Sequence, residues 1–139
     1  MKRKTLVLVL ATIVLFVPTP GSGAVASATV RLVISHVFEN CHVWTMATRE
    51  LGAAAKIVVK RGTKVVIRSD CPMDFDFVQT KGPRLALGDP RTYAGSSRTI
   101  VFRKAGVYRL TATNVQTPEE RGLTTLGDPN TLTLTVVVK

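Results

Sequence analysis

Two short clusters of soft metal ligands stand out in this sequence. The first cluster contains Cys41, His42 and Met46, and the second contains Cys71, Met73 and Asp74. Thiolate, thioether and imidazole groups favour Cu(I), and a carboxylate shifts the preference toward Cu(II) or Zn(II). Copper is therefore the candidate cofactor, at a site built from both clusters.

The two cysteines also permit a different chemistry. In an exported domain, two cysteines commonly form a disulfide. A Cys41–Cys71 bond would close a loop of about 30 residues and would stabilise the fold by about 3.5 kcal/mol in the chain-entropy treatment. It would also remove both thiolates from a metal site, and His42, Met46 and Met73 would then form a poor site. The residues themselves leave three alternatives open: a disulfide, a metal site that uses one or both thiolates, or free thiols.

The first 28 residues have the layout of a secretory signal peptide. A basic start is followed by an uncharged apolar run from Thr5 to Val17, which is shorter than the roughly 20 residues that span a membrane. The triplet Ala26-Ser27-Ala28 fits cleavage after Ala28, and cleavage after Ala26 is a second option. We therefore expect a signal peptide at 1–28 and a mature domain at 29–139 without a transmembrane span. The expected location is secreted or extracytoplasmic, in the periplasm or cell envelope.

Alternation of apolar and polar residues dominates the mature chain and indicates strands. Two such runs, 56–60 and 64–68, flank the turn Arg61-Gly62-Thr63 and predict a hairpin. One helical turn is expected within 48–55. About seven to nine short strands predict an all-β antiparallel sandwich or barrel. The positions expected to point into its core are Val30, Leu32, Ile34, Phe75, Phe77, Ile100, Phe102, Tyr108, Leu110, Ala112, Leu132, Leu134, Val136 and Val138.

Three pieces of this sequence resemble the cupredoxins, the family of blue copper proteins. The pattern Lys-x-Gly-Thr-x-Val occurs at 60–65, and Phe-x-Lys-x-Gly-x-Tyr occurs at 102–108. The run from Asn40 to Trp44 is similar to a Gly-Cys-His-x-Trp element of small exported bacterial cupredoxin-like proteins. The resemblance covers essentially the whole mature chain and implies a Greek-key antiparallel β-sandwich.

The resemblance also implies where a type 1 copper site would lie, and the usual ligands are missing there. Such a site uses two histidines, one cysteine thiolate and a weak axial ligand, usually methionine. The position of the first histidine falls on Asp74 or Phe75, and that of the cysteine falls within Thr111–Thr113. The loop 114–130, which would supply the other ligands, contains no His, Cys or Met. We therefore do not expect a blue-copper electron carrier.

Two functional classes remain, and neither is enzymatic. The adjacent Cys41 and His42 would point to opposite faces of a strand, so the imidazole is badly placed to act as a base for the thiol. The first class is an exported protein that binds copper at the non-standard Cys/His/Met site. The second class is a metal-free, disulfide-stapled binding module of the cell envelope.

The net charge of +10 favours anionic partners. No stretch combines clustered Lys and Arg with aromatic residues as a nucleic-acid groove would, so nucleic acid is not an expected partner. Loops longer than about 12–15 residues in a compact domain are commonly functional. Two alternatives follow for the loop 114–130: a tolerated insertion without a role, or a surface that contacts an anionic cell-envelope component or a protein partner.

Overall fold

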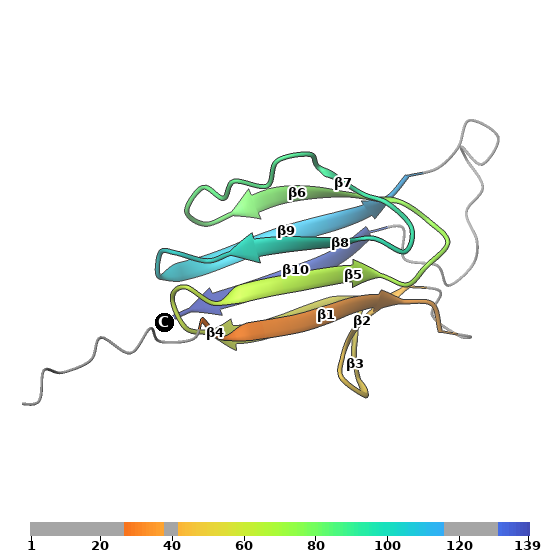
Figure 1. The fold of residues 1–139 in the computed structure, drawn as a ribbon. Helices are drawn as coiled ribbons and strands as arrows, with labels where there is room; N and C mark the ends of the chain where they lie inside the picture. Colours follow the sequence, from red (N-terminus) through yellow and green to blue (C-terminus); the bar gives the residue numbers. More distant parts are fainter. Residues whose placement is uncertain (1–26, 38–41, 116–130) are drawn as a thin grey trace, which may run out of the picture.

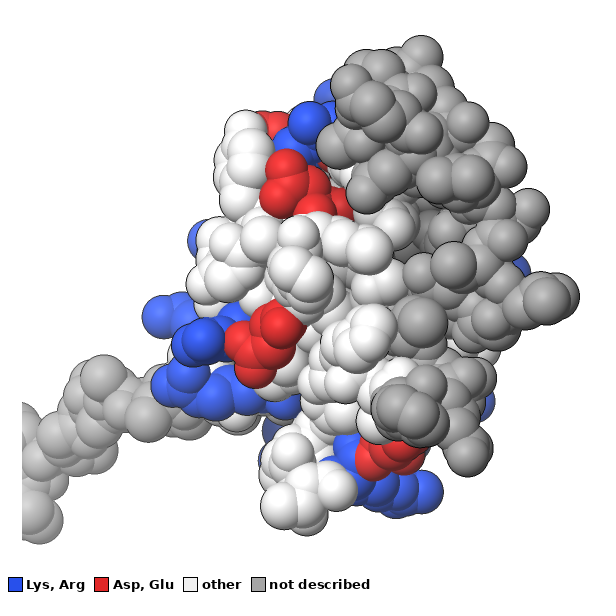
Figure 2. Space-filling view, turned by 90° about the vertical axis from the view of Figure 1, so that its right-hand side faces the viewer, with Lys and Arg blue, Asp and Glu red and all other residues white. Residues whose placement is uncertain are grey.

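A computed structural model describes residues 27–37, 42–115 and 131–139 as ten strands without a helix. One sheet contains β3 (Arg49–Gly52), β2 (Val43–Met46), β1 (Thr29–Ser35), β5 (Lys64–Ser69) and β8 (Ser97–Val101), in that order. The other contains β4 (Ala54–Val59), β10 (Thr131–Val138), β9 (Gly106–Asn114), β6 (Phe75–Lys81) and β7 (Arg91–Thr92). Figure 1 shows the two sheets as stacked layers, and Figure 2 looks onto the end at which β1, β5 and β9 finish. No helix long and apolar enough to cross a membrane occurs in the described ranges.

Most neighbouring strands are antiparallel, but two pairs are parallel. β1 runs parallel to β5, with Leu32 opposite Ile67, and β10 runs parallel to β4, with Val136 opposite Ile57. The predicted all-β Greek-key sandwich is confirmed. Alternation could not reveal the parallel pairs, because side chains alternate between faces with the same period in both kinds of pairing.

The predicted hairpin over 56–60 and 64–68 is wrong. β4 and β5 belong to different sheets, so the turn between them crosses from one layer to the other. The turn is closed by the Thr63 N–H, which donates to the Lys60 carbonyl at 3.1 Å, and Gly62 within it has a φ of 82°. Both runs bury alternate residues, and that pattern fits two strands on opposite sides of a core as well as it fits a hairpin.

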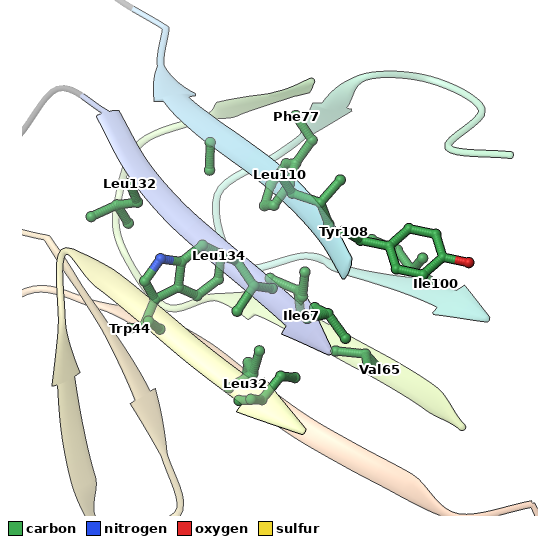
Figure 3. Packing of buried hydrophobic residues seen from close by; sticks show 14 of the residues in the cluster. Leu32, Trp44, Val65, Ile67, Phe77, Ile100, Tyr108, Leu110, Leu132 and Leu134 are labelled. Atoms are coloured by element: carbon green, nitrogen blue, oxygen red, sulfur yellow. The ribbon is translucent and has the colours of Figure 1, made fainter. Parts of the chain in front are cut away.

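The apolar core lies between the two sheets and confirms the inward positions predicted from alternation. Every one of them is buried except Val30, which is half-buried. Figure 3 shows the labelled side chains of both sheets in the space between the layers. The helical turn expected within 48–55 is wrong, because β3 and β4 occupy this stretch and Ala55 and Ile57 continue the period-two burial. Packing of the core holds the strands in place, and the residues of the candidate site lie at the ends of these strands.

Candidate functional site

The strands β1, β5 and β9 finish at the same end of the sandwich, on the right in Figure 1. β2 begins there, because it runs antiparallel to β1 with Val43 opposite Ser35. We call this end the histidine end and define it by the residues His36, His42, Asp70 to Phe75, and Asn114. Four of the six predicted metal ligands lie in it: His42, Cys71, Met73 and Asp74.

The two histidines of the chain lie opposite each other across the β1–β2 ladder. His36 and His42 are the next pair beyond Ser35 and Val43. Their ring centroids are 5.8 Å apart, with an angle of 72° between the ring planes. His42 is fully buried and its ring centroid lies 5.4 Å from that of Phe75, whereas His36 is exposed. One imidazole therefore reaches solvent and the other packs against the core.

The two sulfur-bearing side chains of the second cluster contact both sheets. Cys71 is buried, and its Sγ donates to the carbonyl oxygen of Ile34 in β1 at 3.3 Å. The Sδ of Met73 accepts a hydrogen bond from Nδ2 of Asn114 in β9 at 3.0 Å. These contacts attach the β5–β6 connection to one strand of each sheet. Cys41 lies outside the described residues, so the Cys41–Cys71 disulfide stays a prediction.

The other two predicted ligands have separate surroundings. Oδ1 of Asp74 accepts a hydrogen bond from the Ala94 N–H at 2.9 Å. Met46 lies four residues along β2 from His42, about 13 Å away by strand rise, and packs against the core. Within the described part of the chain, no three His, Cys, Asp or Glu side chains come together as metal ligands would. The described members of the predicted set therefore do not converge on one point.

The residues at the strand ends do not fit a type 1 copper ion. Asp74 and Phe75 stand where the first histidine would be needed, and neither side chain has an imidazole. Phe75 is buried in the core, and Asp74 accepts a backbone hydrogen bond. β9 carries Thr111, Ala112 and Thr113 where a cysteine would be needed, and Ala112 is buried. The remaining positions fall in the loop 114–130, of which only Asn114 and Val115 are described.

A charged network next to the histidine end holds the short strand β7 in place. Nε of Arg91 donates to Oδ1 of Asp76 at 3.0 Å, and this hydrogen bonding raises the pKa of Arg91. Arg98 lies over the ring of Phe77, 4.6 Å from its centroid, and donates to Oγ1 of Thr92 at 2.6 Å. Burial lowers the pKa of Arg98, because desolvation disfavours its charged form. Both arginines therefore act as structural cations that connect β6, β7 and β8.

His36 was not among the predicted ligands, and the signal that would have found it is the strand register. The sequence alone gives no pairing between β1 and β2, so His36 could be judged only by its own apolar neighbours. The observed register, in which Ile34 pairs with Trp44, brings His36 opposite His42. The contact between Asn114 and Met73 likewise depends on a pairing between distant strands.

Comparison with known proteins finds similar solved structures but no match by sequence. No protein-family model and no curated protein matches this sequence. Similar solved structures include the cysteine protease inhibitor EhICP2 from Entamoeba histolytica, at 13% identity and a TM-score of 0.50, over 82% of this chain and 98% of that one. A purple cupredoxin from Nitrosopumilus maritimus matches at 17% identity and a TM-score of 0.45, over 79% and 99% of the two chains. Amicyanin from Paracoccus versutus matches at 13% identity and a TM-score of 0.40, over 85% and 86%.

Identities this low show the fold alone. The assignment rests on the arrangement of the strands, two five-stranded sheets in which parallel β1–β5 and β4–β10 pairs join an otherwise antiparallel Greek key. The fold is a cupredoxin-like β-sandwich. This confirms the resemblance of the sequence at the level of fold.

Proposed function

We propose that this protein is an extracytoplasmic, non-enzymatic binding module, whose histidine end is closed by packing and holds no type 1 copper. One observation carries the proposal: the candidate ligands are already used to hold the fold together. Cys71 donates to β1, Met73 accepts from β9, and Asp74 accepts from the backbone of Ala94. A metal bound through Cys71 would replace the contact of its thiol with β1, and a metal bound through Met73 or Asp74 would compete with their present hydrogen bonds.

A Cys41–Cys71 disulfide is part of this proposal. In the oxidised protein it would replace the thiol hydrogen bond of Cys71 to Ile34, because a disulfide sulfur has no proton to donate, and it would equally keep Cys71 from binding a metal. Cys71 rests against Ile34 of β1, and His42, which follows Cys41, lies beside β1 on its other neighbour, β2. Cys71 follows β5, and His42 precedes β2, and these two strands flank β1. A disulfide between the two cysteines would staple these segments across the end of β1, which suits a module that works outside the reducing cytoplasm.

Mass spectrometry of the protein purified from the exported fraction tests the proposal. The protein is incubated with Cu(II), or with Cu(I) under reductant, passed over a chelator and weighed intact, and a second sample is alkylated with and without reductant. We expect no retained copper, a mass lower by two hydrogen atoms, and alkylation only after reduction. If one equivalent of copper stays bound after the chelator, the proposal that the histidine end is packed and metal-free is wrong.

A second candidate function, copper binding at a non-standard site, is favoured by the cross-strand pair of His36 and His42. Two imidazoles whose centroids lie 5.8 Å apart, one of them exposed, are a reasonable start for a Cu(II) or Cu(I) site. Cys71 or Met73 would join them only after releasing their present hydrogen bonds. If copper is retained, its loss in both His36→Ala and His42→Ala would establish this function in place of the first.

A further inference from the structure

The end of the sandwich opposite the histidine end is densely basic. The β4–β5 turn, the stretch after β6, the β8–β9 turn and the end of β10 occupy it, on the left in Figure 1. No acidic residue lies in the β4–β5 turn, in residues 82–86 after β6, in the β8–β9 turn or at the end of β10. Their exposed basic residues, which we call the basic pole, are Lys60, Arg61, Lys64, Lys81, Arg84, Arg103, Lys104 and Lys139.

Backbone contacts hold the four segments together. The Arg61 N–H donates to the carbonyl of Lys139 at 3.0 Å, and the Gly62 N–H donates to the carbonyl of Phe102 at 2.8 Å. Gly82 lies so close to β9 that an added Cβ would be 2.6 Å from the carbonyl oxygen of Val107. The charges of the basic pole are therefore presented by rigid turns.

The charges of the basic pole are not neutralised by ion pairs within the described residues. The ion pairs found there are Arg68–Asp70 and Arg91–Asp76, and neither includes a residue of the pole. Figure 2, which looks onto the histidine end, shows acidic and basic side chains side by side there, whereas the basic pole carries basic ones. The two ends of the sandwich therefore differ strongly in charge.

A recess in the basic pole could receive an anionic group. It has a volume of about 330 Å³, and Arg84, Arg103, Lys104 and Tyr108 are among the residues that line it. The Tyr108 hydroxyl donates to the carbonyl of Lys104 at 2.7 Å, which fixes the turn that carries two of these cations. Three cations around one recess suit a phosphate group.

A row of valines borders the basic pole on the outer face of the second sheet. Val137 lies opposite Val58 on one side and Val107 on the other. Val58 is 58% exposed and Val107 is 43% exposed. Apolar side chains beside a cluster of cations are typical of surfaces that rest on lipid, where headgroups meet the cations and acyl chains meet the apolar residues. A soluble polyanion would use only the charges.

The start of the domain also lies at the basic pole. Oγ of Ser27 donates to the carbonyl of Gly62 at 2.6 Å, and the Lys64 N–H donates to the carbonyl of Ala28 at 2.9 Å. Residues 27 and 28, which precede β1, therefore lie at the pole.

We propose that the basic pole and the valine row dock this protein on anionic phospholipid headgroups at the outer surface of a membrane. The inference rests on the proposed function, since it names the partner of an extracytoplasmic binding module. Docking of this kind weakens as salt rises, because the attraction of exposed cations to a charged surface extends only about 8 Å at physiological ionic strength.

Co-sedimentation of the exported protein with vesicles tests the proposal. Phosphatidylcholine vesicles containing about one-third phosphatidylglycerol supply the anionic headgroups, and pure phosphatidylcholine vesicles are the control. We expect binding to the anionic vesicles only, and a loss of at least about tenfold in affinity in Arg103→Gln/Lys104→Gln. The matched control is Arg49→Gln/Arg68→Gln, which removes the same charge from exposed positions outside both the pole and the valine row and should bind nearly as the parent does.

The valine row separates lipid from soluble polyanions. We expect Val58→Thr/Val107→Thr to weaken binding to anionic vesicles several-fold and to leave retention on heparin unchanged. Equal losses in the two charge variants, binding to heparin without binding to vesicles, or no vesicle binding at all would each overturn the proposal. These results would leave the proposed function intact, because that depends on copper retention and on the state of the cysteines.

Discussion

At the histidine end, potential metal ligands such as His42 and Cys71 are buried or hydrogen-bonded. At the basic pole, by contrast, the charged side chains are exposed and have no ion-pair partners among the described residues. His42 and Cys71 are both nearly inaccessible to solvent. Lys60 and Lys104 of the pole are exposed. Both ends consist of connections between the same strands, so the difference comes from the residues placed in those connections.

The comparison teaches that a ligand-like residue type does not make a site unless its side chain is available. Contacts such as the hydrogen bond from Asn114 to Met73 stabilise the sandwich. Exposed lysines and arginines contribute little to folding, because water solvates them equally well in the unfolded chain. Substitutions at the histidine end should therefore change stability, and substitutions at the basic pole should change binding.

The largest difference should appear between Phe75→Ala at the histidine end and Lys104→Ala at the basic pole. Phe75 is fully buried against His42, so its truncation should lower the free energy of unfolding by about 3–5 kcal/mol. Lys104 is exposed, and its truncation should change stability by less than about 0.5 kcal/mol. Urea denaturation followed by tryptophan fluorescence measures both values. Similar values for the two variants would contradict the contrast between the ends.

Reduction of the proposed Cys41–Cys71 disulfide should have the next largest effect. The lost cross-link should lower the free energy of unfolding by about 3.5 kcal/mol, and the exported protein with and without reductant gives the comparison. The Cys41→Ser/Cys71→Ser variant should be insensitive to reductant. A parent protein whose denaturation midpoint is unchanged by reductant would show that the cysteines are not joined.

Gly82→Ala should have a smaller effect, and it tests whether backbone packing sets the shape of the basic pole. Gly82 has a φ of 101°, and a new Cβ would lie 2.6 Å from the Val107 carbonyl oxygen, which cannot move without disturbing β9. We expect a loss of about 2–3 kcal/mol in unfolding free energy. Gly88→Ala is the matched control, since Gly88 also has a positive φ but open space around it, and should cost about 1 kcal/mol. Equal losses of unfolding free energy in the two variants would show that the close contact between Gly82 and β9 does not set the shape of the basic pole.

The smallest effect is expected from the loop 114–130, whose role as a contact surface the sequence leaves open. Shortening Thr117 to Gly127 to a tight turn should change the free energy of unfolding by at most about 1 kcal/mol, because loop-closure entropy varies slowly with length. Binding to anionic vesicles should be unchanged, since the basic pole lies at the opposite end. A large loss of vesicle binding in the shortened protein would move the lipid contact from the pole to this loop.

The fold was more predictable than the pairing of its strands. Alternation identified the inward residues because burial on one face of a strand repeats every second residue. It could not distinguish a hairpin from a crossover at Gly62, because both arrangements bury the same valines. The pairs Leu32–Ile67 and Val136–Ile57 join strands far apart in the sequence, and local patterns do not specify such long-range partners.

The candidate site was less predictable, because its members depend on register and packing. The sequence identified His42, Cys71 and Met73 by residue type, but it could not show that Cys71 donates to Ile34 or that Met73 accepts from Asn114. The basic pole could have been predicted from the positions of the basic residues along the chain, which the net charge alone does not show. Lysines and arginines lie in the connections after β4, β6, β8 and β10, which all reach the same end of the sandwich.

The visible absorption spectrum after addition of Cu(II) to the purified exported protein tests the central claim most directly. A type 1 site gives an intense blue colour because a cysteine thiolate binds the copper. The packed histidine end, with Thr111–Thr113 in place of that cysteine, predicts no intense blue band and an unchanged thermal unfolding midpoint. An intense blue band, together with a higher midpoint, would contradict the account and would show that a thiolate of this chain is available to the metal.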